Sequence, residues 1–206
     1  MERLYSVRQY TRSIHMNFTR ILENIELDIT RECNFNCPSC LSFSNLYNKN
    51  LKSVMTLDEI YNIMKDFKLK NIHIHRLEIL GGEPTLHPQF KDVCKFLRQY
   101  IDNNNIVDNV YLYTNHSNKL LVNWVELSTD FKIVDSEIRN KTVEELKALK
   151  VKGHYNLYAI NKIEDLSNDV IYKCGGIEKC GLTIYKFNNE IRYAVCCYSA
   201  FIARLL

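Results

Sequence analysis

The stretch Ile25-Glu-Leu-Asp-Ile-Thr-Arg-Glu-Cys-Asn-Phe-Asn-Cys-Pro-Ser-Cys40 joins a predicted strand to a group of three cysteines. Residues 25–30 alternate apolar and polar side chains, which predicts a strand. Cys33, Cys37 and Cys40 follow directly, so the C-x3-C-x2-C group is expected on the loop after this strand. Three thiolates on one short loop can face a single metal centre.

A group of three cysteines leaves two kinds of metal site open. A structural zinc ion takes four protein ligands in closed tetrahedral geometry, so a distant cysteine or histidine would have to complete the site. Iron–sulfur clusters are bound by cysteine thiolates, and a cubane held by three of them leaves one iron free for a substrate or cofactor. The spacing alone does not identify the metal.

The rest of the chain alternates predicted strands and helices. Further strands are expected over residues 75–80, 110–114, 131–136 and 155–160. The helices between them carry apolar side chains at i, i+3, i+4 and i+7, and capping boxes begin two of them, at Thr56 with Glu59 and at Thr142 with Glu145. This order predicts an α/β fold with a mainly parallel sheet. Such folds place their chemistry at the carboxyl ends of strands.

A second motif, Leu80-Gly-Gly-Glu-Pro-Thr-Leu-His-Pro88, ends the second predicted strand. Glycines permit a close backbone approach and unusual dihedral angles at the edge of the sheet. Glu83 offers a carboxylate acceptor that can bind an ammonium group. A lone Gly-Gly pair fits a simple strand-to-helix turn, but the two motifs together are far more specific.

Residues 27–40 and 81–88 resemble the radical SAM superfamily, with the resemblance extending over about residues 25–160. It implies a partial (β/α) barrel of about five to six units. It implies that Cys33, Cys37 and Cys40 hold a 4Fe–4S cluster, whose open iron is chelated by S-adenosylmethionine. The cofactor contacts that it implies come from strand ends: Gly81, Gly82, Glu83, Thr114, Asn115 and Ser136. The sequence departs from the common pattern at two positions: Ser39 replaces an aromatic residue and His116 replaces a glycine.

The resemblance also implies a reaction. The cofactor is cleaved reductively to methionine and a 5′-deoxyadenosyl radical, which abstracts hydrogen from a substrate. An electron donor such as flavodoxin or ferredoxin is the expected partner, and a peptide, protein or sugar-linked substrate is favoured over a nucleotide. Two alternatives stay open: an activase that installs a glycyl radical on a partner protein, and a non-catalytic zinc or iron–sulfur binding module.

A second group of cysteines surrounds a predicted hairpin. The hairpin strands are expected at 182–187 and 191–195, joined by Asn188-Asn189, and the cysteines are Cys174, Cys180, Cys196 and Cys197. We expect a barrel domain over 1–161 and a small Cys-containing hairpin appendage over 162–206. The layout resembles the start of a SPASM or twitch extension, which implies a second iron–sulfur cluster; a zinc site and buried thiols are the alternatives.

Composition narrows the remaining classes. The 206 residues are 46% hydrophobic and 25% charged, which is typical of a globular chain. The net charge of +3 is too even to indicate a nucleic-acid partner. The sequence contains no run of 18 apolar residues, so no membrane-spanning helix is predicted. Eight cysteines without a secretory signal indicate a reducing compartment, so we expect a cytoplasmic protein.

Two histidines near the start of the second strand share one strand face. His73 and His75 alternate with Ile72 and Ile74, so their side chains lie on the same side. The pair could bind a metal ion, but a solvated strand entry is the expected reading.

Overall fold

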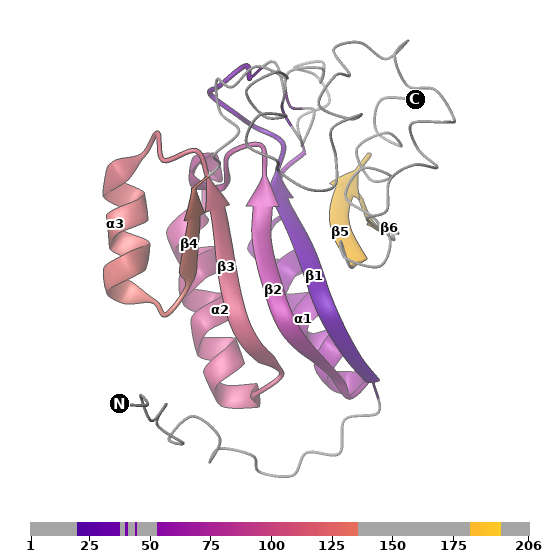
Figure 1. Ribbon diagram of the computed structural model, residues 1–206. Coiled ribbons are helices and arrows are strands. Elements are labelled where there is room, and N and C mark those ends of the chain that lie inside the picture. Colours follow the sequence, from indigo (N-terminus) through magenta and orange to yellow (C-terminus); the bar gives the residue numbers. More distant parts are fainter. Residues whose placement is uncertain (1–19, 38–39, 41–43, 45–52, 136–181, 195–206) are drawn as a thin grey trace, which may run out of the picture.

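The computed structural model describes residues 20–37, 40, 44, 53–135 and 182–194. Six strands form one sheet in the order β4-β3-β2-β1-β5-β6. All neighbouring pairs are parallel except β5 and β6, which are antiparallel. Figure 1 shows the arrowheads of β1 to β4 at the same edge of the sheet. The predicted α/β fold is confirmed, with the mainly parallel sheet that a partial (β/α) barrel requires.

The elements follow the predicted order. The strands are β1 (Arg20–Thr30), β2 (Ile72–Gly81), β3 (Val107–Thr114), β4 (Lys132–Asp135), β5 (Leu182–Phe187) and β6 (Glu190–Ala194). The helices are α1 (Leu57–Leu69), the short 3-10 helix η3 (Pro84–Leu86), α2 (Phe90–Asn104) and α3 (Lys119–Ser128). The predicted helix after Thr142 and the strand at 155–160 lie outside the described residues. None of the helices that the structure describes is long and apolar enough to cross a membrane.

The hydrophobic core lies between the sheet and helices α1 and α2, which cover one face (Figure 1). Fully buried side chains from three elements meet there, among them Ile25, Leu27, Ile29, Ile60, Met64, Val93 and Leu97. The capping box at the start of α1 is confirmed: Thr56 Oγ1 accepts the Glu59 N–H at 3.2 Å, and Glu59 Oε2 accepts the Thr56 N–H at 2.7 Å. Because the apolar residues of β1 face these helices, the alternate residues lie on the opposite face.

The hairpin is confirmed, but it extends the sheet. Asn188 and Asn189 both have positive φ angles, 48° and 62°, as a tight turn between β5 and β6 requires. β5 pairs in parallel with β1, from Ile25 opposite Leu182 onward. Within the expected appendage, β5 and β6 therefore form one edge of the main sheet. They do so because the backbone groups of β1 on the side away from β2 pair with β5. The domain boundary expected at 161 lies outside the described residues.

Candidate functional site

Three segments far apart in the sequence meet at the carboxyl edge of the sheet. The cysteine loop follows β1, the Gly81-Gly82-Glu83 turn follows β2, and Thr114-Asn115 ends β3. Since the three strands are parallel neighbours, their carboxyl ends lie side by side. Direct hydrogen bonds join all three segments.

The two glycines are where the cysteine loop rests on β2. The Gly82 N–H donates to Thr30 O at 2.8 Å, and the Glu83 N–H donates to Glu32 O at 2.7 Å. A Cβ atom at Gly81 would lie 2.1 Å from Thr30 O, and one at Gly82 would lie 2.3 Å from Glu32 O. Gly81 also has a φ of +156°, a backbone angle that residues other than glycine rarely adopt. The close backbone approach predicted here is made by the chain itself, which fixes the base of the loop.

The Glu83 carboxylate joins the ends of β2 and β3. Its side chain is fully buried. Oε1 accepts hydrogen bonds from the Thr85 hydroxyl at 2.7 Å, the Thr85 N–H at 3.1 Å and the Thr114 hydroxyl at 2.8 Å, while Oε2 accepts the Asn115 N–H at 2.6 Å. These four donors satisfy both oxygens of the buried carboxylate. Binding of an ammonium group by Glu83 stays a prediction. In the structure, the Glu83 carboxylate connects the end of β2 to the end of β3 through its hydrogen bonds.

Asn115 links β3 to the cysteine loop. Its Nδ2 donates to Asn34 Oδ1 at 3.1 Å and to Cys33 Sγ at 3.8 Å. Its Oδ1 accepts the Ser117 N–H at 2.9 Å, and the Ser117 hydroxyl reaches Asn34 Oδ1 at 3.3 Å. The sequence analysis did not identify Asn34 or Ser117 as site residues. The hydrogen bond from the Ser117 N–H to Asn115 Oδ1 forms an Asx-turn, a turn that Asn favours whatever residue follows.

His116 shows why a glycine is common at its position. It has a φ of +55°, in the left-handed region that glycine adopts without steric cost. The substitution noted in the sequence therefore keeps the turn, at the cost of a strained backbone, because a non-glycine residue is disfavoured there.

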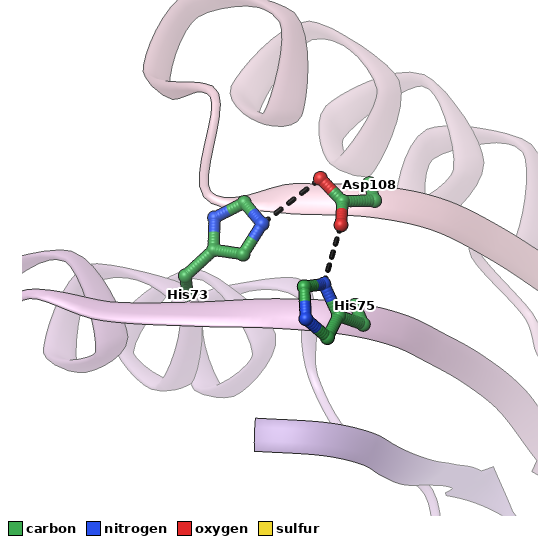
Figure 2. A group of neighbouring side chains, drawn as sticks. All are labelled: His73, His75 and Asp108. Carbon is green, nitrogen blue, oxygen red and sulfur yellow. Dashed lines mark hydrogen bonds and ion pairs between the residues drawn. The ribbon is translucent and has the colours of Figure 1, made fainter. Parts of the chain in front are cut away.

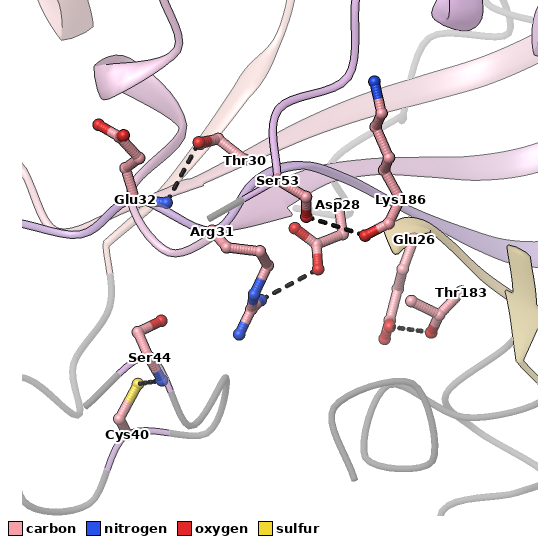
Figure 3. A network of polar contacts seen from close by, with 10 residues as sticks. All are labelled: Glu26, Asp28, Thr30, Arg31, Glu32, Cys40, Ser44, Ser53, Thr183 and Lys186. Atoms are coloured by element: carbon pink, nitrogen blue, oxygen red, sulfur yellow. Dashed lines mark hydrogen bonds and ion pairs between the residues drawn. The ribbon is translucent and has the colours of Figure 1, made fainter. Parts of the chain in front are cut away.

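The three thiols are free and half-buried, and two of them accept hydrogen bonds from backbone N–H groups. Cys33 Sγ accepts the Phe35 N–H at 3.4 Å, and Cys40 Sγ accepts the Ser44 N–H at 3.3 Å (Figure 3). Burial raises the pKa of Cys33, and repulsion from Cys40, Glu83 and Cys37 adds to this, while the Phe35 N–H lowers it, so a cation bound at Cys33 would favour its thiolate. Hydrogen bonds to sulfur are a usual feature of iron–sulfur ligands.

Behind the loop, the second face of the sheet is polar. Arg31 and Asp28 form an ion pair at 3.0 Å in which both side chains are almost fully buried (Figure 3). On β2 and β3, the Tyr113 hydroxyl donates to Glu78 at 3.2 Å, and burial raises the pKa of Glu78. Burial and the nearby Glu78 charge raise the pKa of Tyr113 to about 12. Charged and hydroxyl groups thus line the face opposite the helices.

Five predicted site residues lie outside the described residues: Ser136, Cys174, Cys180, Cys196 and Cys197. The other eight, namely Cys33, Cys37, Cys40, Gly81, Gly82, Glu83, Thr114 and Asn115, all belong to the three segments that meet at this edge.

A family model of the radical SAM superfamily matches residues 27–160, which include the cysteine loop and both strand-end motifs. The chain belongs to the radical SAM superfamily. A 4Fe–4S cluster and S-adenosylmethionine, the cofactors of this superfamily, are therefore implied for this radical SAM protein, as the sequence predicted.

Curated relatives add a named activity. The chain is 35% identical over 82 residues to GTP 3′,8-cyclase of Pasteurella multocida, and 33% identical over 82 residues to that of Yersinia pestis. Each match covers 40% of this chain and 24% of the relative, so this radical SAM chain aligns with about a quarter of those proteins. A crystal structure of BtrN in complex with AdoMet and 2-DOIA aligns with 74% of this chain and 55% of BtrN, at 16% identity and a TM-score of 0.45.

Proposed function

We propose that this protein is a radical SAM enzyme in which Cys33, Cys37 and Cys40 hold the 4Fe–4S cluster. The observation that carries the proposal is the joining of three motifs into one site, with Asn115 reaching Cys33 Sγ and Glu83 holding Asn115. Three thiols leave one iron of a cubane open, and this is the position that S-adenosylmethionine requires.

When bound, the two cofactors supply the hard chemistry: reductive cleavage to a 5′-deoxyadenosyl radical that abstracts hydrogen from a substrate. The residues of this chain position them. Gly81 and Gly82 allow the backbone at the start of the cysteine loop to lie directly against the end of β2. Glu83 fixes the distance between the turn and β3. Asn115 orients Cys33 and shares its amide with Asn34. We further propose that the cofactor lies over this edge, against Gly81 to Glu83, Thr114, Asn115 and Ser136.

The test is anaerobic reconstitution of the purified chain with iron and sulfide. We expect brown protein with about four iron and four sulfide atoms per cluster. Addition of dithionite and S-adenosylmethionine is expected to release 5′-deoxyadenosine. The variant Cys37→Ala should lose both the cluster and nucleoside release.

Cys94→Ala is the matched control. Cys94 is fully buried in α2 and lies in the hydrophobic core, away from the three motifs. This variant should keep its cluster and its nucleoside release. Colourless protein holding stoichiometric zinc, or equal nucleoside release from wild type and Cys37→Ala, would refute the proposal and favour the binding module.

GTP is the first substrate to test, because the curated relatives carry the name GTP 3′,8-cyclase. A GTP substrate would raise 5′-deoxyadenosine release above the rate without substrate and would be consumed. If GTP has no effect, a peptide, protein or sugar-linked substrate becomes the proposal. A glycyl-radical activase would instead install a radical on its partner protein, detectable by electron paramagnetic resonance.

Two further proposals concern the partners of the site. A flavodoxin or ferredoxin would donate the electron in place of dithionite. The tail cysteines would hold a second cluster, as in a SPASM or twitch extension. The described part of the tail, β5 and β6, is part of the same sheet as β1. The variant Cys180→Ala should leave the first cluster intact; loss of that cluster would refute this division of the cysteines.

A further inference from the structure

A second cluster of metal-ligand side chains lies at the opposite end of the strands from the cysteine loop. His73 and His75 stand near the start of β2, and Asp108 stands near the start of β3. These strands are parallel, and Ile74 pairs with Val107 while Arg76 pairs with Asn109, which sets Asp108 beside His75. The cluster is therefore separate from the site proposed for the radical chemistry.

The three side chains converge on one point (Figure 2). His73 Nε2 lies 2.9 Å from Asp108 Oδ1, and His75 Nδ1 lies 2.5 Å from Asp108 Oδ2. The three ligand atoms all lie within 4.8 Å of one another. Ligands about 2.0 to 2.1 Å from one zinc ion in tetrahedral geometry are separated by roughly 3.4 Å, so small side-chain rotations suffice.

The surroundings suit a divalent cation with nitrogen and oxygen ligands. The carboxylate supplies negative charge, and two imidazoles are ligands that zinc and neighbouring transition metals prefer. The remaining ring nitrogen of His75, Nε2, lies 4.0 Å from Glu23 Oε1 on β1. A metal-bound histidine commonly directs its other nitrogen to a carboxylate, which orients the ring.

Exposure leaves room for the remaining coordination positions. The His73 side chain is 11% exposed, whereas those of His75 and Asp108 are 42% and 43% exposed. Two of the three ligands are thus reachable from solvent, and water can complete a tetrahedral shell. The third is fixed in the sheet, so the cluster is held on two paired strands instead of on a loop.

We propose that His73, His75 and Asp108 form a zinc-type divalent cation site that joins the amino ends of β2 and β3. The ion would bind the folded sheet, in which the three ligands are assembled from two strands, and so would stabilise that pairing. It requires no contribution from the cysteines.

The experiment measures zinc binding to the full chain after its cluster has been reconstituted, so that the cysteine loop is occupied. Wild type is compared with His75→Ala and Asp108→Asn, whose side chains are partly exposed and whose replacement leaves the core intact. We expect wild type to bind about one zinc ion per chain more than either variant. X-ray absorption at the zinc edge should show nitrogen or oxygen ligands at about 2.0 to 2.1 Å, and the variants should lose this shell.

Glu190→Gln is the charge-matched control. Glu190 pairs with Arg192 at 3.0 Å and its side chain is 68% exposed, and β1 and β5 separate its strand, β6, from β2, so this variant removes one carboxylate charge away from the cluster. It should bind zinc as wild type does. Equal zinc content in wild type, His75→Ala and Asp108→Asn would overturn the proposal. So would a zinc spectrum composed of sulfur ligands alone, at about 2.3 Å.

Discussion

Replacing Gly82 by alanine tests whether the turn after β2 positions the cysteine loop. The new Cβ would lie 2.3 Å from Glu32 O, whereas an ordinary contact is at about 3.5 Å, so the loop would have to move by about 1.2 Å. That movement would break the hydrogen bonds from Gly82 N–H to Thr30 O and from Glu83 N–H to Glu32 O. Two buried groups left without partners cost roughly 1 to 3 kcal/mol each.

At the low end of this range, about 1 kcal/mol for each of the two groups, the total cost is about 2 kcal/mol. This cost lowers the population of the ordered loop by about 30-fold. We therefore expect Gly82→Ala to bind less iron and sulfide after reconstitution and to release 5′-deoxyadenosine at least about 10-fold more slowly. The hydrophobic core should survive, because the clash lies at the edge of the sheet. Circular dichroism checks the fold, and iron analysis with nucleoside quantification checks the site.

Gln89→Ala is the control for an alanine placed close to the same turn, since Gln89 makes no side-chain cap at the start of α2. It should behave as wild type. Full iron content and wild-type nucleoside release in Gly82→Ala would refute the reasoning, because the loop would then tolerate the displacement.

Three further predictions concern single residues. Asn115→Leu removes a hydrogen bond to Cys33 Sγ, so the cluster should become harder to reduce and its midpoint potential, followed by paramagnetic resonance in a redox titration, should fall; an unchanged potential contradicts this. Thr56→Ala removes the accepting half of the capping box with Glu59 and should lower the free energy of unfolding by about 1 kcal/mol in urea titrations. Burial raises the pKa of Cys94 to about 12, above its value in the unfolded chain. Its contribution to stability is therefore full below about pH 9 and is lost as pH rises further, a loss that Cys94→Ala should abolish in denaturation curves recorded between pH 8 and 10.

Local patterns in the sequence were enough to predict the main elements. The alternation at 25–30, the capping box at Thr56 and the Asn188-Asn189 turn each act over a few residues, and all are confirmed. The start of β1 was missed, because Arg20 to Asn24 enter the strand through backbone pairing with β2 and not through an alternating pattern.

The contacts within the site could not be predicted, because they join residues distant in sequence. The sequence identified Glu83 as a carboxylate acceptor, but it could not show that Thr114, 31 residues away, and the Asn115 backbone N–H donate to it. It likewise indicated that the glycines make room at the edge of the sheet, but not that Thr30 and Glu32 occupy that room. For the same reason, the contacts of Asp108 with His73 and His75 could not be predicted, because they depend on the register of β2 and β3.

The pairing of β5 with β1 has a consequence for synthesis of the chain. Glu26 and Thr183, which are joined by a hydrogen bond, are 157 residues apart (Figure 3). During translation, the outer backbone groups of β1 must wait until β5 emerges from the ribosome. Contacts of such long range slow folding, and a waiting strand edge is prone to pair with other chains. Faster translation would shorten this exposure and should therefore favour recovery of this protein from the soluble fraction.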